Sequence, residues 1–440
     1  MYRFQTRFIL AAGSAALLGL GCGGDDGDDG GNNPDARPID AVASTCPDHP
    51  AVTDMGAVCA ITGPDTAPIT QNLSLTANNQ YLLAGPVFIG DDSATTVLTI
   101  EPGVTIYGGD GSFLLIQRGS RIEANGTAAA PIVMTSAKAV GQRGASDWGG
   151  LILNGRAPIN FGDASGVAQG EAGTGTYGGN MAGDNSGTLR YVRVEFAGNK
   201  VDAENELNGI AFQGVGSGTT VEYIQTHLTS DDGVEFFGGT VSVKYLVVTG
   251  SDDDSIDWVG GWSGNVQFAV VEQKAGSGLE AERGIEADNF EGNHAATPVS
   301  APVLSNLTLI GRTGNNAQGV EFRRGTRAQL HNSIITGWGG PCLRVSNDQT
   351  IANVTAGTLA VNNLVLDCGA ALAGAAVDLA AAGNVVTANP MLSGWAPGAS
   401  SPARNIGAGP TGSFFTAVTY AGALDGTTDW TAGWTTSAEN

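Results

Sequence analysis

The sequence predicts an all-β fold, a right-handed parallel β-helix (solenoid) with N- and C-terminal caps. Short apolar runs separated by Gly, Asn, Asp or Pro fill most of the chain, and no long stretch shows helical periodicity. Glycine supplies 67 of the 440 residues, which favours tight turns, and 42% of residues are hydrophobic, enough for a large core. The segment Asp231–Gly239 recurs as Asp253–Gly261, 22 residues later, and so short a repeat is typical of one solenoid coil.

Residues 1–21 are predicted to be a lipoprotein signal peptide. Two arginines precede an apolar run that is too short to span a membrane as a mature helix. The run ends at Gly19-Leu20-Gly21-Cys22, which resembles a bacterial lipobox, so we expect Cys22 to be lipidated and to anchor the protein in the outer membrane. An ordinary signal peptide with a chance cysteine is the alternative.

Residues 22–45 are predicted to be an acidic, Gly- and Asp-rich disordered tether, because they contain almost nothing to bury. The whole chain carries 20 Lys and Arg against 43 Asp and Glu, a formal charge of −23. Such a surface repels phosphate backbones, which excludes nucleic acid as a partner.

Four further cysteines predict two disulfides. Cys46 and Cys59, and Cys342 and Cys368, form local pairs, and of the three possible connectivities this one closes the smallest loops. Disulfides agree with an exported protein. A zinc site is the weaker alternative, because there is no Cys-x-x-Cys and the four histidines are scattered. Residues 46–90 are expected to form the N-terminal cap.

Residues 91–387 are predicted to form the β-helix itself, with one short helix within 370–382. A β-propeller is the alternative, but its blades need about 40–50 residues. Equivalent positions of successive coils predict two ladders inside the coil, one aromatic and one of buried asparagines at a turn. Their members are Tyr191, Tyr223, Tyr245 and Phe268, and then Asn306, Asn332 and Asn363.

One column of acidic side chains is predicted on the outer face. In Gly-Val-Glu-Phe strands the side chains alternate, so Val234 and Phe236 point inward and Glu235 points outward. Rungs are about 4.8 Å apart, so stacked like charges are costly unless a cation lies between them. The column comprises Ala211, Glu235, Asp257, Glu286, Glu321 and Arg344.

These carboxylates suit a calcium ion, which prefers six to eight oxygen ligands. The alternative is that Asp and Asn only cap turns through bonds to the backbone, and Arg283, Arg323, Arg324 and Arg344 are near enough to neutralise part of the column. The candidate calcium ligands are Asp231, Asp232, Glu235, Asp253, Asp254, Asp257 and Glu286.

No catalytic residue is identified. Paired carboxylates serve glycoside hydrolases, and Ser230-Asp231-Asp232-Gly233 superficially resembles polygalacturonases, but the Gly-His-Gly and Arg-Ile-Lys segments that complete that site are absent. Arg323 or Arg344 are candidates for the base of a lyase, and nothing fixes either in that role. Four tryptophans are candidates for sugar stacking or for lids over the coil: Trp148, Trp258, Trp262 and Trp338.

Several segments together resemble a family of exported or lipid-anchored β-helix proteins of Gram-negative envelopes, mostly uncharacterised. They are residues 147–155, 186–198, 231–239 and 420–434, and the resemblance covers roughly residues 90–436. It implies the pectin-lyase-like fold but no established activity, so no catalytic residue is carried over. A single-chain solenoid has open ends, so we expect residues 388–440 to form a C-terminal cap that packs back on the coil.

We therefore expect a non-enzymatic lipoprotein of the outer membrane, surface-exposed or periplasmic, and monomeric. Its acidic, calcium-binding face would contact a glycan or another envelope protein. The alternative is a polysaccharide lyase or glycoside hydrolase acting on acidic polysaccharide. An enzyme needs a cleft, and the insertions at 155–187 and 273–303 are where a cleft would be built.

Overall fold

A computed structural model describes residues 46–202, 205–275, 282–312, 314 and 316–439. The predicted signal peptide, Cys22 and the tether at 22–45 lie outside the described residues. Within the described residues, no helix has the length and apolar character needed to span a membrane.

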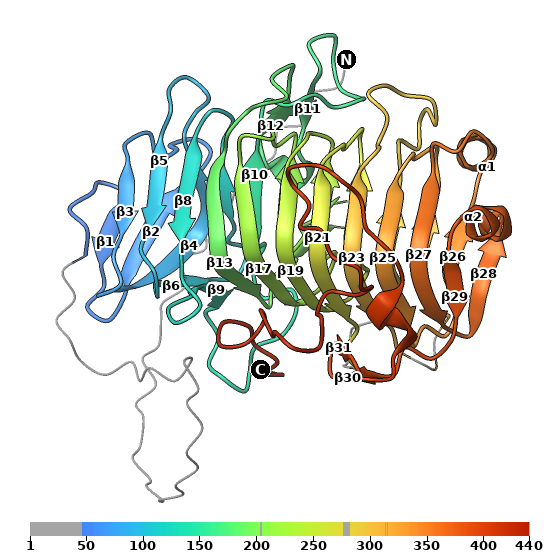
Figure 1. Ribbon diagram of the computed structural model, residues 1–440. Coiled ribbons are helices and arrows are strands. Elements are labelled where there is room, and N and C mark those ends of the chain that lie inside the picture. The colour runs from blue at the N-terminus through green and yellow to red at the C-terminus, as the bar shows by residue number, and fades with distance from the viewer. Residues whose placement is uncertain (1–45, 203–204, 276–281, 313, 315, 440) are drawn as a thin grey trace, which may run out of the picture. The chain divides into compact units, whose positions relative to one another are not determined.

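The fold is a right-handed parallel β-helix, as predicted, in which a 25-stranded sheet winds along the molecule (Figure 1). The strands stack in three parallel ladders, because each coil contributes one short strand to each face. Long strands bend and serve two faces.

The first ladder consists of β3 (Leu73–Leu75), β5 (Val97–Ile100), β8 (Arg121–Asn125) and the first halves of β13 (Gly187–Glu195), β17 (Thr220–Thr229), β19 (Ser242–Ser251), β21 (Asn265–Glu272), β23 (Val303–Ile310), β25 (Gln329–Thr336) and β27 (Ala360–Asp367). The second consists of β2 (Cys59–Gly63), the first half of β4 (Gln80–Ile89), β6 (Thr105–Gly108), β9 (Ile132–Ser136), the second halves of β13, β17, β19, β21, β23, β25 and β27, and β29 (Val385–Thr387). The third consists of the second half of β4, then β7 (Leu114–Ile116), β10 (Leu151–Asn154), β16 (Ile210–Gln213), β18 (Val234–Phe237), β20 (Asp254–Val259), β22 (Arg283–Ala287), β24 (Gln318–Phe322), β26 (Pro341–Val345) and β28 (Ala370–Gly374).

The remaining elements decorate the coil. They are β1 (Val52–Asp54), the hairpin of β11 (Val167–Gln169) and β12 (Thr176–Gly178), the pair β14 (Lys200–Asp202) and β15 (Asn205–Glu206), the pair β30 (Leu392–Ser393) and β31 (Ala396–Pro397), the helices α1 (Asp348–Thr355) and α2 (Ala376–Ala382), and the 3-10 turns η1 (Glu171–Gly173) and η2 (Pro402–Asn405). The predicted short helix within 370–382 is present as α2, after the strand β28.

The four tryptophans considered for sugar stacking are buried inside the coil. Trp148, Trp258 and Trp262 have no exposed surface, and Trp338 is 1% exposed. The Trp148 indole nitrogen donates to the Glu195 carbonyl, and a Cβ on Gly108 would come within 2.4 Å of the Trp148 ring. These rings fill the core and are unavailable to a ligand.

The two predicted ladders form a single column at the bend of the long strands. The aromatic rings stack as predicted, with centroids 4.4 Å apart for Tyr191 and Tyr223, 4.2 Å for Tyr223 and Tyr245, and 5.2 Å for Tyr245 and Phe268. Their expected place inside the coil is wrong. Each has a positive φ between 49° and 64°, which interrupts the alternation of faces and turns the ring outward.

The asparagines continue this column, also with positive φ, a conformation that Asn tolerates well. The Asn363 side-chain amide donates to Asn332 Oδ1 at 2.9 Å, which is the predicted bond from rung to rung. Asn306 and Asn332 also donate to the Tyr420 carbonyl. The asparagine ladder therefore holds the C-terminal segment as well as its neighbours.

Both predicted disulfides are present, Cys46–Cys59 and Cys342–Cys368. At the N-terminal end β1 pairs antiparallel with β2, but β2 already pairs in parallel with β4. The coil therefore begins inside the segment 46–90 that was expected to be a cap.

The C-terminal segment packs back on the coil, as expected, but it lies along the side and not over the end (Figure 1). Backbone carbonyls of Ala408, Thr416 and Thr436 accept bonds from Asn363, Gln267 and Gln225 in turn, so the segment passes the rungs in reverse order. Trp434 packs edge-on against Tyr191, with centroids 5.6 Å apart. The last rung is instead contacted by α2.

Candidate functional site

The predicted acidic column lies on the third ladder. Strand register aligns Glu235 of β18 with Asp257 of β20, and Asp257 with Glu286 of β22. Val234 and Phe236 are completely buried in the core, as the alternation of faces predicts. The aligned positions, in order, are Ala211, Glu235, Asp257, Glu286, Glu321 and Arg344.

Five carboxylates near the start of this column form a compact group, which we call the carboxylate cluster. Side-chain oxygens of Asp231, Asp232 and Asp253 lie within 4.8 Å of one another, and so do those of Asp232, Glu235 and Asp257. Asp232 belongs to both sets. In the part of the chain that the structure describes, no Lys or Arg forms an ion pair with any of the five.

Tight turns bring the cluster together. Asp231 and Asp232 precede β18, and Asp253 occupies the equivalent turn before β20, one rung further on. Gly233 permits this spacing, because a Cβ there would lie 2.4 Å from the Val248 side chain and 2.6 Å from the Ser255 carbonyl oxygen.

The turn-capping alternative holds for part of the cluster. Asp232 Oδ1 accepts a bond of 3.0 Å from the Asp254 backbone N–H, and Asn208 donates to Glu235 Oε2 at 2.7 Å. Asp253 Oδ1 and Asp257 Oδ1, by contrast, are buried without a hydrogen-bond partner. Turn capping therefore leaves these two oxygens unexplained.

The cluster is held in an environment that disfavours its negative charge. Burial, followed by the charges of Glu206 and Asp253, raises the pKa of Asp231 to about 8. Burial and neighbouring carboxylates also raise the pKa of Asp232, Glu235 and Asp257 well above the ordinary range. Such a group takes up protons or a cation.

The next rungs of the same column have a different arrangement, which we call the arginine-paired segment: Glu286, Asp288 and Glu321 with Arg283, Arg323, Arg324 and Arg344. Arg283 contacts Glu286 Oε1 at 2.8 Å and Glu321 Oε2 at 2.9 Å. Arg323 binds Glu286 and reaches Asp288 Oδ1 at 2.8 Å. Arg324 lies 2.7 Å from Asp288 Oδ2, and Arg344 lies 3.3 Å from Glu321 Oε1.

The structure thus divides the seven predicted calcium ligands. Five form the carboxylate cluster, whereas Glu286 has both oxygens on arginines. Asp254 lies between the two groups, since its Oδ2 is 3.4 Å from Arg283 and its Oδ1 is buried without a partner.

The arginines considered as lyase bases are engaged in ion pairs. Burial acts to lower the pKa of Arg323, but a hydrogen bond to Asp288 and the charges of Glu286 and Asp288 outweigh it, so the pKa is raised. Arg344 pairs with Glu321 and bonds to Ser346. Arg323, with its raised pKa, is poorly suited to accept a proton, and carboxylates hold both guanidinium groups.

Two residues of the insertion between β10 and β13 belong to the site and were missed. Although Glu171 keeps an exposed surface, partial desolvation by the surrounding chain, followed by the charge of Glu206, raises its pKa to about 6. Burial, then the charges of Glu235 and Glu171, raises the pKa of Tyr177. Tyr177 packs on Phe237 with ring centroids 6.1 Å apart, so the insertion lies over this ladder. The insertion was visible in the sequence, but nothing in it marked these two side chains.

Comparison with known proteins agrees with the fold. The family model described as a pectate-lyase-like β-helix domain matches residues 67–435, a span that includes both the coil and the C-terminal segment. No curated protein and no solved structure gives a significant match. The chain therefore belongs to the family of pectate-lyase-like β-helix domains.

Proposed function

We propose that this protein is a non-enzymatic binding module of the cell envelope that holds calcium in its carboxylate cluster and uses this face to bind polysaccharide. The observation that supports it best is the cluster itself: five crowded carboxylates without an ion-paired Lys or Arg among the described residues. Calcium prefers such hard oxygen ligands and tolerates irregular geometry.

The unpartnered oxygens favour a bound cation over turn capping alone. Asp253 Oδ1 and Asp257 Oδ1 are buried and make no hydrogen bond, which is costly for a carboxylate. Both belong to one rung, Asp253 in the turn before β20 and Asp257 on β20 itself, and both lie close to Asp232 of the preceding rung. A cation between the two rungs, shared with Asp232, would give these oxygens a partner and remove the repulsion.

Polysaccharide is the favoured ligand because the family description points to carbohydrate and because the coil offers a long, regular face. A calcium ion on that face would attract the carboxylate groups of acidic glycans. Anchoring through a lipid on Cys22, in the outer membrane, remains part of the proposal and rests on the sequence alone.

The direct test is a thermal melt of the metal-stripped protein with and without millimolar calcium. We expect a clear rise in Tm, because a ligand at about 100 times its Kd stabilises the folded state by about 2.7 kcal/mol. The double variant Asp253→Asn with Asp257→Asn should lose the rise. Asp65→Asn with Asp110→Asn, both exposed, is the matched control and should keep it.

The proposal fails if calcium does not raise Tm, or if the cluster variant responds like the control. Magnesium serves as a second comparison. It demands near-octahedral geometry and gives up its waters reluctantly, so it should stabilise the protein less than calcium does.

A polysaccharide lyase or hydrolase is the second candidate, favoured by the family and by Glu171, whose pKa of about 6 suits an acid near neutral pH. Incubation with acidic polysaccharides should then release new chain ends. Glu171→Gln should abolish that release, whereas calcium binding should survive.

A further inference from the structure

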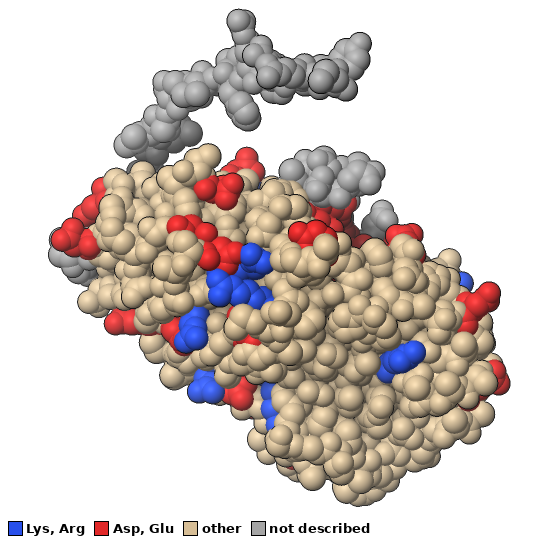
Figure 2. Space-filling model, turned by 90° about the horizontal axis from the view of Figure 1, so that it is seen from above, with Lys and Arg blue, Asp and Glu red and all other residues tan. Residues whose placement is uncertain are grey.

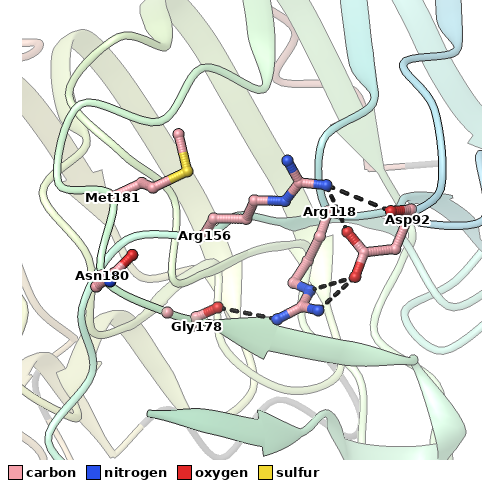
Figure 3. Close-up of a pocket in the computed structure, with 7 residues that line it drawn as sticks. Asp92, Arg118, Arg156, Gly178, Asn180 and Met181 are labelled. Atoms are coloured by element: carbon pink, nitrogen blue, oxygen red, sulfur yellow. Dashed lines mark hydrogen bonds and ion pairs between the residues drawn. The ribbon is translucent and has the colours of Figure 1, made fainter. Parts of the chain in front are cut away.

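A basic pocket lies away from the carboxylate cluster, at one corner of the first rungs (Figure 3). Asp92, Arg118 and Arg156 each follow the end of a strand of the third ladder, β4, β7 and β10. Because those strands are stacked in register, the three side chains meet at the same corner of successive rungs. The pocket is shallow and open to solvent, and its volume is about 340 Å³.

The two arginines share one carboxylate. Arg118 binds Asp92 Oδ2 through Nε and Nη2, and its Nη1 donates to the Gly178 carbonyl at 3.1 Å. Arg156 Nη2 donates to Asp92 Oδ1 at 2.7 Å. The three side chains therefore carry a net positive charge on a protein whose formal charge is −23. Figure 2 shows how few Lys and Arg residues lie on one face of the molecule, several of them gathered beside acidic side chains.

The insertion between β10 and β13 closes one side of the pocket. It contributes the backbone of Gly178 and Gly179 and the residues Asn180 and Met181. A Cβ on Gly179 would lie 2.8 Å from the Arg156 carbonyl oxygen, and one on Gly178 would lie 2.5 Å from the Gly166 carbonyl oxygen. Both glycines also have positive φ. Glycine thus lets the insertion approach Arg156 closely.

Arg156 keeps two donor nitrogens for a ligand. Arg118 uses all three guanidinium nitrogens on Asp92 and Gly178, whereas Arg156 uses only Nη2. Among the described residues, Arg156 Nε and Nη1 make no bond, and Figure 3 shows the guanidinium reaching into the pocket between Met181 and Asp92. Met181, 50% exposed, adds an apolar surface at the rim.

We propose that this pocket binds one oxyanion, a carboxylate or sulfate group, through a free guanidinium nitrogen of Arg156. Nε or Nη1 can donate a charge-assisted hydrogen bond to such a group, and Met181 offers a surface for the apolar part of its carrier. The oxyanion arrives either as a free ion or on an acidic saccharide. The inference goes beyond the proposed function, because the pocket needs neither calcium nor the carboxylate cluster.

Titration calorimetry on the whole chain, with a calcium chelator present, tests the site. Sodium sulfate represents the free ion, sodium glucuronate the saccharide-borne carboxylate, and glucose the neutral control. We expect binding of glucuronate, of sulfate or of both, and none of glucose. Tighter binding of glucuronate identifies a saccharide as the carrier, and equal binding identifies the oxyanion as the whole determinant.

Three variants test whether Arg156 is responsible. Arg156→Gln should weaken binding by at least about tenfold, because it removes the positive charge and the guanidinium donors. Arg121→Gln removes the same charge from an exposed strand position and should bind like the wild type. Asp92→Asn should tighten binding, since it frees both arginines from their internal partner. A purely structural ion pair predicts the opposite, lower stability with no gain in binding.

The inference is overturned if neither anion binds, or if Arg156→Gln binds as well as Arg121→Gln. If Asp92→Asn does not fold, the comparison of the two arginine variants still decides the question. Because calcium is absent throughout, failure here leaves the proposed calcium site untouched, and a failed calcium melt leaves this pocket untouched.

Discussion

The carboxylate cluster and the arginine-paired segment occupy the same column of the same ladder, yet they neutralise their charges differently. Asp257 and Glu286 are register partners on adjacent strands. Both of Glu286's oxygens contact arginines, at Arg283 and Arg323, whereas Asp257 Oδ1 is buried without a partner. Backbone position is equivalent in the two rungs, so the difference comes from which neighbouring strands and turns supply arginine.

The comparison shows that stacking alone does not determine what an acidic column does. A β-helix places identical positions about 4.8 Å apart, so every carboxylate column needs positive charge, protons or a metal. Arg283 and Arg323 supply that charge from inside the chain at Glu286. At Asp232 and Asp257, protons or an external ion must supply the positive charge.

The largest effect is expected from removing an internal cation. Arg283→Met deletes a side chain that contacts Asp254, Glu286 and Glu321 together. Arg283 is 14% exposed, and breaking a buried pair by removing one partner costs about 3–5 kcal/mol. Urea unfolding of the variant should show that loss. Arg344→Met, at a side chain that is 47% exposed, should cost less than about 1 kcal/mol.

Equal losses for the two arginine variants would contradict this account of the segment. Calcium provides a further check, because Arg283→Met leaves new uncompensated carboxylates beside the cluster. The variant should therefore gain more stability from calcium than the wild type gains.

A smaller effect, with opposite signs in the two regions, is expected from neutralising one carboxylate. In metal-free protein at alkaline pH, where the cluster is ionised, Asp257→Asn should raise the free energy of unfolding by about 1–3 kcal/mol, because it removes a charge that burial and its neighbours disfavour. Glu321→Gln should lower it by about 1–3 kcal/mol, because Arg283 and Ser346 lose a charged partner. Urea unfolding measures both.

The exposed control Asp110→Asn should change stability by less than about 0.5 kcal/mol. If both carboxylate variants shift stability in the same direction, the division of the column into two electrostatic regions is wrong.

Much of the fold was predictable because it depends on pattern and register. The 22-residue repeat gave the coil, and alternation placed Glu235 outside and Val234 inside. Alternation failed at the bend, where Tyr191 and its equivalents have positive φ and turn outward beneath the C-terminal segment. A left-handed residue in a strand leaves no periodic signal, although asparagine in the same column is a hint of it.

The site was predictable as a column but not as two regions. Arg283 lies on the same strand as Glu286, and Arg323 lies in the turn after β24, so the sequence placed both arginines nearby. Which carboxylate each long side chain reaches depends on rotamers and packing, which sequence periodicity does not encode. Glu171 was missed for a similar reason, since the fold of an insertion over a ladder depends on tertiary contacts such as Tyr177 on Phe237.

The last prediction concerns the pH dependence of stability, where the change per pH unit is small. Its sign should differ between the carboxylate cluster and the arginine-paired segment. The pKa of Asp231 is raised to about 8 in the folded protein, against an ordinary value of 3.8, so folding takes up a proton between those values. Stability of the metal-free protein should therefore fall as the pH rises from about 4 to about 8, by at most about 1.4 kcal/mol per pH unit for each such group.

Glu321 should act in the opposite sense. Burial acts to raise its pKa, but hydrogen bonds from Ser346 and Arg283 outweigh burial and lower the pKa below 4.5, so its contribution to stability is lost as the pH falls further. Urea midpoints across this range should thus pass through a maximum on the acidic side of neutrality. Saturating calcium, which replaces protons in the cluster, should remove the decline above the maximum and leave the acidic limb unchanged. A decline that persists in calcium, or that survives in the Asp253→Asn with Asp257→Asn variant at full size, would place its origin outside the carboxylate cluster.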